Sequence, residues 1–113
     1  MYSDLAQRLG SDVDAERRSE LRSFLESCRS RLGPIEVGLP RTPRRRVPGL
    51  RREEVAELTG VSVNWYSSFE RGQPVRVSPG FVSRVARALR LAADEELRLF
   101  RLAFAEMYRL ERR

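Results

Sequence analysis

The stretch that decides the fold is residues 50–72, which read LRREEVAELTGVSVNWYSSFERG. Gly60 can bend the chain sharply, because glycine adopts backbone angles that other residues avoid. Ser62 follows and is placed to cap a new helix, which we expect to run over 63–71 and to end at Gly72. The side chains expected to face a core are Leu50, Val55, Leu58, Tyr66 and Phe69. The stretch therefore predicts two short helices joined by a tight turn.

The residues around this turn suit two helices that cross at close range. Ala56 has a side chain small enough to let the helices approach, and Val61 can fill the angle between them. A two-turn helix, a tight turn with glycine and a capped second helix have the spacing of the DNA-binding helix-turn-helix. We expect this unit over 51–72, with helix 63–71 reading the major groove of duplex DNA.

Upstream, one strong helix and one weak helix are expected. Ser11 and Asp12 can cap a helix whose apolar residues fall on one face of a 3.6-residue period and which ends at Gly33 and Pro34. That stripe is Leu21, Phe24, Leu25, Cys28 and Leu32. A short helix from Ser3 to Leu9 would precede it and stop before Gly10. We divide the chain into a partly helical extension, 1–19, and a domain, 20–110.

Downstream, two further helices are expected. Ser78 followed by Pro79 is a strong helix start, and the apolar stripe after it favours burial. That stripe is Phe81, Val82, Val85, Ala86, Leu89 and Leu91. A last helix, 94–110, opens with three acids that suit its positive end. No strand pattern appears, so we predict an all-α bundle of five helices, or six if 3–9 forms one.

Positive charge is concentrated in the Pro-rich loop 34–50 and just beyond it. The net charge is +6, and all 22 basic residues are arginine. Six of them occur without an acidic residue between Pro40 and Arg52: Arg41, Arg44, Arg45, Arg46, Arg51 and Arg52. Such a cluster is typical of a phosphate-binding patch. The absence of lysine has a second interpretation, a GC-rich genome whose codons favour arginine.

Composition argues against several classes of protein. Cys28 is the single cysteine and histidine is absent, so an internal disulfide, a zinc site and a histidine-dependent triad are not expected. The Cys28 thiol lies in an apolar stripe and is expected to be buried. No Gly-rich phosphate loop, apolar run of bilayer length or signal peptide is present. We therefore expect a cytoplasmic protein that is not an enzyme and uses no cofactor or metal.

The residues also resemble a known family. LRREEVAELTGVS over 50–62, the Glu-Arg-Gly at 70–72 and the Ser-Pro at 78–79 look like the Xre-type, lambdoid phage repressor-like domain. RRRVPGLRREEVA over 44–56 is similar to the MmyB-like subgroup of actinobacterial regulators. The resemblance covers about 21–103 and implies a five-helix domain that binds operator DNA, commonly as a dimer. MmyB-like regulators generally carry a further sensor-like domain, so this chain is either a short member or a fragment.

In Xre-type domains the first turn of the recognition helix meets base edges. The corresponding residues here are Val63, Asn64, Ser67 and Ser68. The Asn64 amide can pair with adenine N6 and N7, and Val63 can pack on a thymine methyl group. Each of the four has the alternative of being an ordinary surface or space-filling residue. Trp65 could stack on a base, but partial burial against the neighbouring helix is the favoured interpretation.

Phosphate contacts are expected from arginines that flank the recognition helix. Arg52 occupies the place of a glutamine that starts the first motif helix in phage repressors, and its neighbour Arg51, with Arg71 and Arg76, also belongs to the expected set. Arg44, Arg45 and Arg46 would clamp the backbone or enter a narrow minor groove. By family analogy Glu70 has a structural role and pairs with an arginine of the earlier helix, Arg29.

Two rival functions remain at the level of sequence. The last helix has apolar residues on more than one face, which suits a homodimer or a protein-interaction module such as a coactivator or an antitoxin-like partner. Those residues are Leu97, Leu99, Phe100, Leu102, Phe104, Met107 and Leu110. Binding of RNA or single strands is disfavoured, because the aromatic residues are not spaced along an exposed platform.

Overall fold

The computed structural model describes residues 2–33, 35–38 and 49–111, with side chains from Asp12 onward. Six α-helices and one 3-10 turn, and no strand, occur in this part of the chain. The elements are α1 (Tyr2–Ser30), η1 (Ile35–Val37), α2 (Arg52–Thr59), α3 (Val63–Glu70), α4 (Pro79–Ala88), α5 (Ala93–Ala103) and α6 (Ala105–Glu111). The all-α prediction is confirmed.

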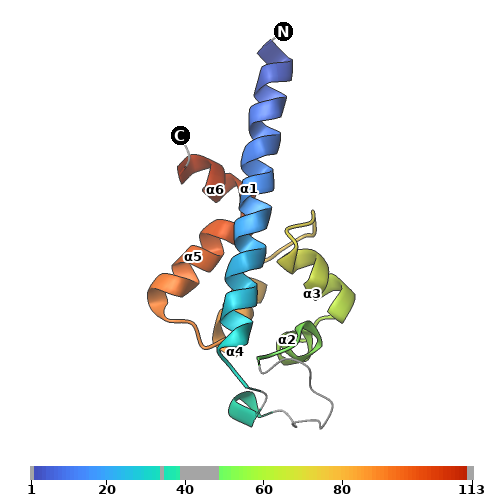
Figure 1. Ribbon diagram of the computed structural model, residues 1–113, viewed down its shortest axis with the longest axis vertical. Helices are drawn as coiled ribbons and strands as arrows, with labels where there is room; N and C mark the ends of the chain where they lie inside the picture. Colours follow the sequence, from blue (N-terminus) through green and yellow to red (C-terminus); the bar gives the residue numbers. More distant parts are fainter. Residues whose placement is uncertain (1, 34, 39–48, 112–113) are drawn as a thin grey trace.

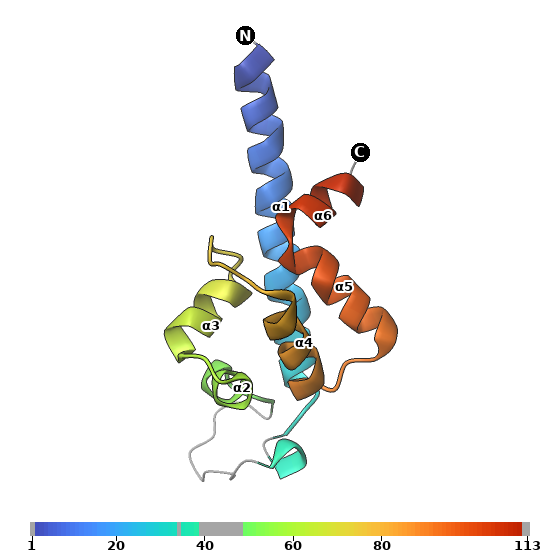
Figure 2. The same ribbon diagram turned by 180° about the vertical axis from the view of Figure 1, so that it is seen from behind.

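The long helix α1 is the spine of the molecule (Figure 1). α2 and α3 lie on one side of α1, and α5 and α6 lie on the other. Figure 2 shows from behind that α4 stands between the two groups, in agreement with its contacts to α2 and α5. The N-terminal part of α1 reaches past the other helices, which explains why the longest dimension is 57 Å against 28 and 21 Å for the others.

The expected break at Gly10 is wrong, because α1 is one helix of 29 residues. A glycine inside a helix costs about 1 kcal/mol relative to alanine, which a helix already nucleated and packed further along can absorb. Ser11 and Asp12 are consequently interior residues of α1 and cap no second helix. The boundary proposed between residues 19 and 20 falls inside α1.

The single helix expected over 94–110 is also wrong, because the chain bends at Phe104. This residue has extended backbone angles, φ −110° and ψ 109°, and separates α5 from α6. The bend turns α6 toward α1, where Tyr108 is buried and its hydroxyl donates to Glu20 Oε1 at 3.1 Å. The packing of one aromatic residue on the spine thus outweighs a continuous helical pattern.

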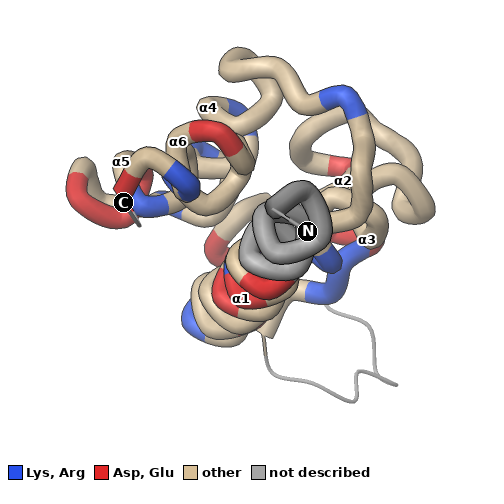
Figure 3. The backbone as a smooth tube through the Cα atoms, turned by 90° about the horizontal axis from the view of Figure 1, so that it is seen from above, with Lys and Arg blue, Asp and Glu red and all other residues tan. Residues whose placement is uncertain are grey.

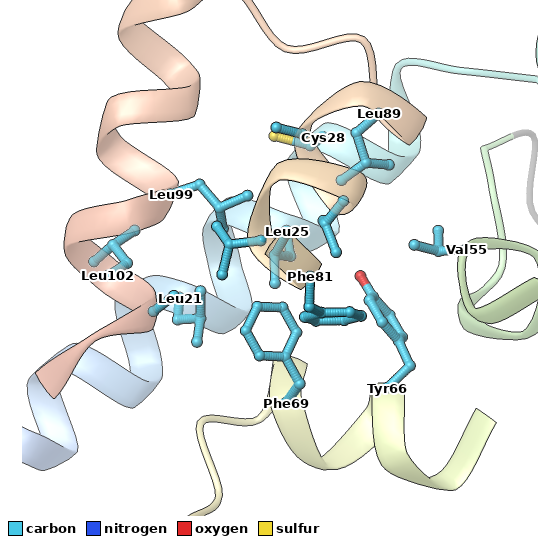
Figure 4. Packing of buried hydrophobic residues seen from close by; sticks show 14 of the residues in the cluster. Leu21, Leu25, Cys28, Val55, Tyr66, Phe69, Phe81, Leu89, Leu99 and Leu102 are labelled. Atoms are coloured by element: carbon cyan, nitrogen blue, oxygen red, sulfur yellow. The ribbon is translucent and has the colours of Figure 1, made fainter. Parts of the chain in front are cut away.

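The predicted apolar stripes meet in one core (Figure 4). Leu21, Leu25 and Cys28 of α1 face buried residues of α4 and α5, and the burial predicted for Cys28 is confirmed. The Phe69 and Phe81 rings pack edge to face, with centroids 5.0 Å apart. Such aromatic pairs stabilise a core beyond the area they bury. The core therefore joins α1, α3, α4 and α5.

Two close contacts fasten the end of α3 to α1. Gly72 has φ +72°, and a Cβ atom there would lie 2.4 Å from Arg18 Cγ and 2.9 Å from its Cα. The buried Arg17 guanidinium donates to the carbonyl oxygens of Gly72, at 3.4 Å, and of Leu102, at 3.1 Å. Its Nε donates to Asp14 at 3.0 Å, so the buried charge has a partner. The spine, the end of α3 and the end of α5 are held together at this point.

The contact at Gly72 can be tested against Gly60, which has a similar φ of +76° but open space around its position for a Cβ atom. Gly60→Ala should cost about 1 kcal/mol of unfolding free energy, from the left-handed backbone alone. Gly72→Ala should cost about 2–4 kcal/mol, because overpacking against α1 is added. Urea denaturation of both variants measures the difference. Equal losses of unfolding free energy in the two variants would show that α1 moves at Arg18 to make room for the added Cβ atom.

Above neutral pH, the stability of the fold depends on two buried groups, the Cys28 thiol and the Tyr66 hydroxyl. The sequence has neither histidine nor lysine. Burial raises the pKa of the Cys28 thiol, and burial together with the Glu70 carboxylate raises the pKa of Tyr66 well above its ordinary value. Both groups thus stay protonated in the folded chain to higher pH than in the unfolded chain.

The unfolding free energy should therefore be level between about pH 6 and 8 and decline as pH rises through about 8.5 and 10, the ordinary values of the two groups. The decline should continue until the raised pKa values of the folded state are passed. Urea unfolding measured across this pH range tests the expected decline. In Cys28→Ala the unfolding free energy should begin to decline at a higher pH than in the unaltered chain. A slope already present between pH 6 and 8 would contradict the assignment.

Candidate nucleic-acid interface

The turn between α2 and α3 has the geometry expected from its sequence. Gly60 is left-handed and ends α2, with its N–H directed at the carbonyl oxygens of Ala56 and Glu57. Val61 N donates to the same Ala56 oxygen at 3.1 Å. The Ser62 hydroxyl then accepts from Trp65 N at 3.1 Å and caps α3. The predicted helix-turn-helix unit is thus present, with Arg71 as the C-cap of α3.

α3 has one face in the core and one face in solvent. Tyr66, Phe69 and Glu70 are buried. On the other side Val63 is 39% exposed and Asn64 is exposed, whereas Ser67 and Ser68 are half-buried. The structure therefore brings the four predicted base-contact residues to one outer surface, with Val63 and Asn64 the most accessible.

Trp65 lies between the core and the surface. It is half-buried, and its ring packs edge-on against Phe81 of α4, with centroids 4.6 Å apart. The same ring is parallel to Phe69 at 6.2 Å. The predicted partial burial against a neighbouring helix is confirmed, and the indole holds the first turn of α3 against α4.

Glu70 is the electrostatic centre of the motif. Its side chain is 0% exposed and accepts bonds from Arg29 Nη2 at 2.6 Å and Arg29 Nε at 3.1 Å. Burial would lower the pKa of Arg29, but the Glu70 carboxylate outweighs it and raises that pKa, so the guanidinium stays charged. The pairing implied by family analogy is confirmed.

Arg29 also connects the motif to the entrance of α2. Its Nη1 donates to the Leu50 carbonyl oxygen at 3.0 Å, and Leu50 N donates to the Arg29 carbonyl oxygen at 2.9 Å. Gly49 makes this approach possible, since a Cβ atom there would lie 2.5 Å from Ser30 Cα. α1, the start of α2 and the end of α3 therefore meet at one arginine.

The predicted phosphate-binding arginines are placed differently from one another. Arg52 is half-buried, and its Nε donates to Glu70 Oε1 at 3.2 Å, a contact that the sequence did not suggest. Arg51 is half-buried at the N-cap of α2, where its backbone N–H donates to Glu54 Oε1 at 2.8 Å. Arg71 and Arg76 are exposed. Arg44, Arg45 and Arg46 lie outside the described residues.

The charges around this surface are unevenly distributed (Figure 3). Seen along α1, a basic segment lies on the α3–α4 connection and others lie where α1 meets the motif, whereas α1, α5 and α6 carry both acidic and basic segments. Arg71 Nε donates to the Ser67 carbonyl oxygen at 3.3 Å, which keeps the guanidinium beside the outer face of α3. This face can accept an anionic partner along its edge.

The fold and the exposed first turn of α3 define a helix-turn-helix protein. The family model described as "Helix-turn-helix domain" matches residues 16–100 of the 113, so the chain belongs to that family. Membership indicates a DNA-binding regulator in general terms. A search of curated proteins and a search of solved structures found no match.

Two further properties of the described residues bear on function. None of the helices there is both long and apolar enough to cross a lipid bilayer. In the same part of the chain, no group of three or more acidic or cysteine side chains is arranged to hold a metal ion.

The structural role of Glu70 makes a direct prediction. Glu70→Ala leaves the Arg29 guanidinium without its carboxylate and should cost about 3–5 kcal/mol of unfolding free energy. Glu26→Ala, which removes an exposed partner of Arg22 and a 3.9 Å neighbour of Arg52, should cost less than about 1 kcal/mol. Thermal and urea unfolding measure both. Weakened DNA binding by Glu70→Ala with unchanged melting would contradict the structural role.

Proposed function

We propose that this chain is a sequence-specific regulator of transcription that binds duplex DNA with α3 in the major groove. The observation that carries the proposal is the outward first turn of α3, which Trp65 packs against α4 while the Arg29–Glu70 ion pair holds the other end of the helix on α1. A helix fixed in this way presents side chains to base edges without first having to be ordered. It acts by binding, and no catalytic step is assigned to it.

Asn64 is the residue we assign to a base, through paired hydrogen bonds with adenine N6 and N7. Val63 would pack against a thymine methyl group, and the hydroxyls of Ser67 and Ser68 would bond to bases or nearby phosphates. Exposure of Val63 and Asn64 supports the first two roles. The half-buried serines suit a helix that lies close to the floor of the groove.

Phosphates would be bound on both sides of α3. Arg51 and Arg52 stand at the start of α2, and Arg71 and Arg76 follow α3. Since Arg52 donates its Nε to Glu70 and has its Nη2 3.9 Å from Glu26 Oε1, Nη1 is the nitrogen that would bond to DNA. We include Arg44, Arg45 and Arg46 as contacts to the backbone or minor groove, on sequence alone. The resemblance to Xre-type, MmyB-like regulators extends the proposal to an actinobacterial protein that works on the nucleoid in the cytoplasm.

A homodimer is part of the proposal. Three large apolar side chains of α5 and α6 are exposed, Leu97 by 49%, Met107 by 40% and Leu110 by 62%. Pairing of two copies through this surface would bury them and set two recognition helices about 34 Å apart, one turn of DNA. A two-fold symmetric operator is then expected.

The base assignment is tested by selecting bound sequences from a random duplex pool. The chain should enrich a short motif containing adenine, and Asn64→Ala should lose the adenine preference at one position while keeping the rest. Ser19→Ala, on the exposed surface of α1, is the matched control and should enrich the same motif as the unaltered chain. Identical motifs for all three proteins would remove Asn64 from the base-reading set.

The electrostatic part of the proposal has its own measurement. If about six arginines each neutralise a phosphate, log affinity should fall against log salt with a slope of about −5. Titrations of a labelled duplex at several salt concentrations give this slope. A slope near zero would exclude the duplex as partner.

A protein-interaction module is the second candidate function, and the exposed apolar residues of α5 and α6 favour it. The two candidates differ in oligomeric state and in DNA affinity. Light scattering on the pure chain that gives a monomer, together with no binding to duplex DNA, would support a different protein as the partner of α5 and α6.

A further inference from the structure

A second basic segment of the chain lies outside the proposed DNA contacts. Residues 71–93 contain five arginines and no acidic residue. Arg71 and Arg76 belong to the proposed phosphate contacts. The other three are Arg84, Arg87 and Arg90, which follow one another at three-residue spacing along α4 and its C-terminal end. We call these three residues the α4 ridge.

The α4 ridge faces solvent. Phe81, Val82 and Val85 bury the opposite side of α4 in the core, while all three arginines are exposed. At 1.5 Å per residue, Arg84 and Arg87 lie about 4.5 Å apart along α4, and Arg90 follows just beyond the end of the helix. α4 contacts α2 and α5, and its buried residues face the core, so the three exposed arginines form a row on its outer side.

The ridge arginines have no carboxylate partner among the described residues, unlike several exposed arginines on α1, just beyond the end of α1 and on α5. Arg22, Arg31 and Arg101 each pair with a carboxylate, at 3.1, 2.8 and 2.5 Å. Among the described residues no carboxylate pairs with Arg84, Arg87 or Arg90. Instead Arg84 Nε donates to the Thr59 carbonyl oxygen at 3.2 Å, and Arg90 donates to the Glu36 carbonyl oxygen. No paired carboxylate of the described residues therefore offsets the positive charge of the ridge.

Two of the three guanidinium groups are held in place. Arg84 lies over the Phe81 ring, 5.7 Å from its centroid, and its bond to Thr59 fixes it beside the last residue of α2. Arg90 has φ +54°, a left-handed conformation that glycine would adopt more easily. A planar donor fork held by a backbone carbonyl is suited to the oxygens of a phosphate.

We infer that the α4 ridge binds backbone phosphates of DNA that flanks the sequence read by α3. The inference rests on the proposed function and extends its footprint. Charge complementarity supports DNA as the occupant, since the ridge has no acidic residue of its own. Continuity supports it as well, because the same acid-free segment begins at Arg71 beside α3 and Arg84 contacts the end of α2.

The test uses the full chain and the site obtained by selection, in two duplexes. In one the site ends within half a helical turn, and in the other a full turn of about 10 base pairs is added at each end. The ridge variant carries Arg84→Gln, Arg87→Gln and Arg90→Gln. The matched control carries Arg22→Gln, Arg101→Gln and Arg109→Gln, and loses the same charge from α1, α5 and α6. Thermal melting establishes that both variants fold.

The unaltered chain should bind the longer duplex more tightly than the shorter one. The ridge variant should lose that gain, which corresponds to a loss of affinity for the longer duplex of roughly tenfold or more. Its plot of log affinity against log salt on the longer duplex should be shallower by about 2.7, the value for three phosphates. The control should keep the gain. Arg87→Glu alone provides a second variant, because no described residue bonds to the Arg87 guanidinium, and it should weaken only the longer duplex.

Equal losses in the ridge variant and the control would overturn the inference, and so would equal affinity of the unaltered chain for the two duplexes. Either result leaves the proposed function intact if the selected site is still bound specifically. Failure of the unaltered chain to bind any duplex would overturn both. If the ridge variant melts at a lower temperature than the unaltered chain, Arg87→Glu provides the test instead. Unchanged affinity of Arg87→Glu for the longer duplex would contradict the inference.

Discussion

The bond between Glu70 and Arg29 is the constraint on which the rest of the arrangement depends. A carboxylate with no exposed surface is costly unless it is paired and hydrogen-bonded, and here one guanidinium satisfies both oxygens. The pair links the last residue of α3 to the last turn of α1. Because Arg29 also holds the Leu50 carbonyl oxygen, the entrance of α2 is fixed by the same side chain. The motif is thus tied to the spine at both of its ends.

Close backbone contacts complete what the ion pair begins. Gly49 and Gly72 each lie so near α1 that a Cβ atom would collide with it, at 2.5 and 2.4 Å. One precedes α2 and the other follows α3, so the helix-turn-helix is enclosed between two points of contact with one helix. Between them, the Gly60 turn and the outer surface of α3 face away from α1. The orientation of the recognition helix is therefore a property of the whole bundle.

Much of this could be predicted from local patterns. The turn at Gly60, the cap at Ser62 and the apolar stripes of α3 and α4 depend on neighbouring residues, and the structure has them where the sequence places them. The two wrong boundaries have different causes. At Gly10 a helix nucleated further along continues through one unfavourable residue, whereas at Phe104 the burial of Tyr108, which a short window of sequence does not reveal, bends the chain.

The candidate site divides in the same way. Exposure of Asn64 follows from helical periodicity and was predictable. The bond of Arg52 to Glu70 and the bond of Arg17 to Gly72 join residues far apart in the chain, and the spacing of residues in the sequence does not predict them. The Arg29–Glu70 pair was foreseen through a family resemblance, which supplies long-range information that a single sequence lacks.

The buried Cys28 gives the molecule a built-in reporter. Cys28 of α1 is 2% exposed and belongs to the core, and the chain has no other thiol. A thiol reagent can reach it only when the helices separate, so the rate of labelling under native conditions measures how often the bundle opens. A DNA ligand that binds only the closed bundle would slow that labelling in proportion to its occupancy. Labelling of a thiol in the core would thus report DNA binding at the outer surface of the molecule.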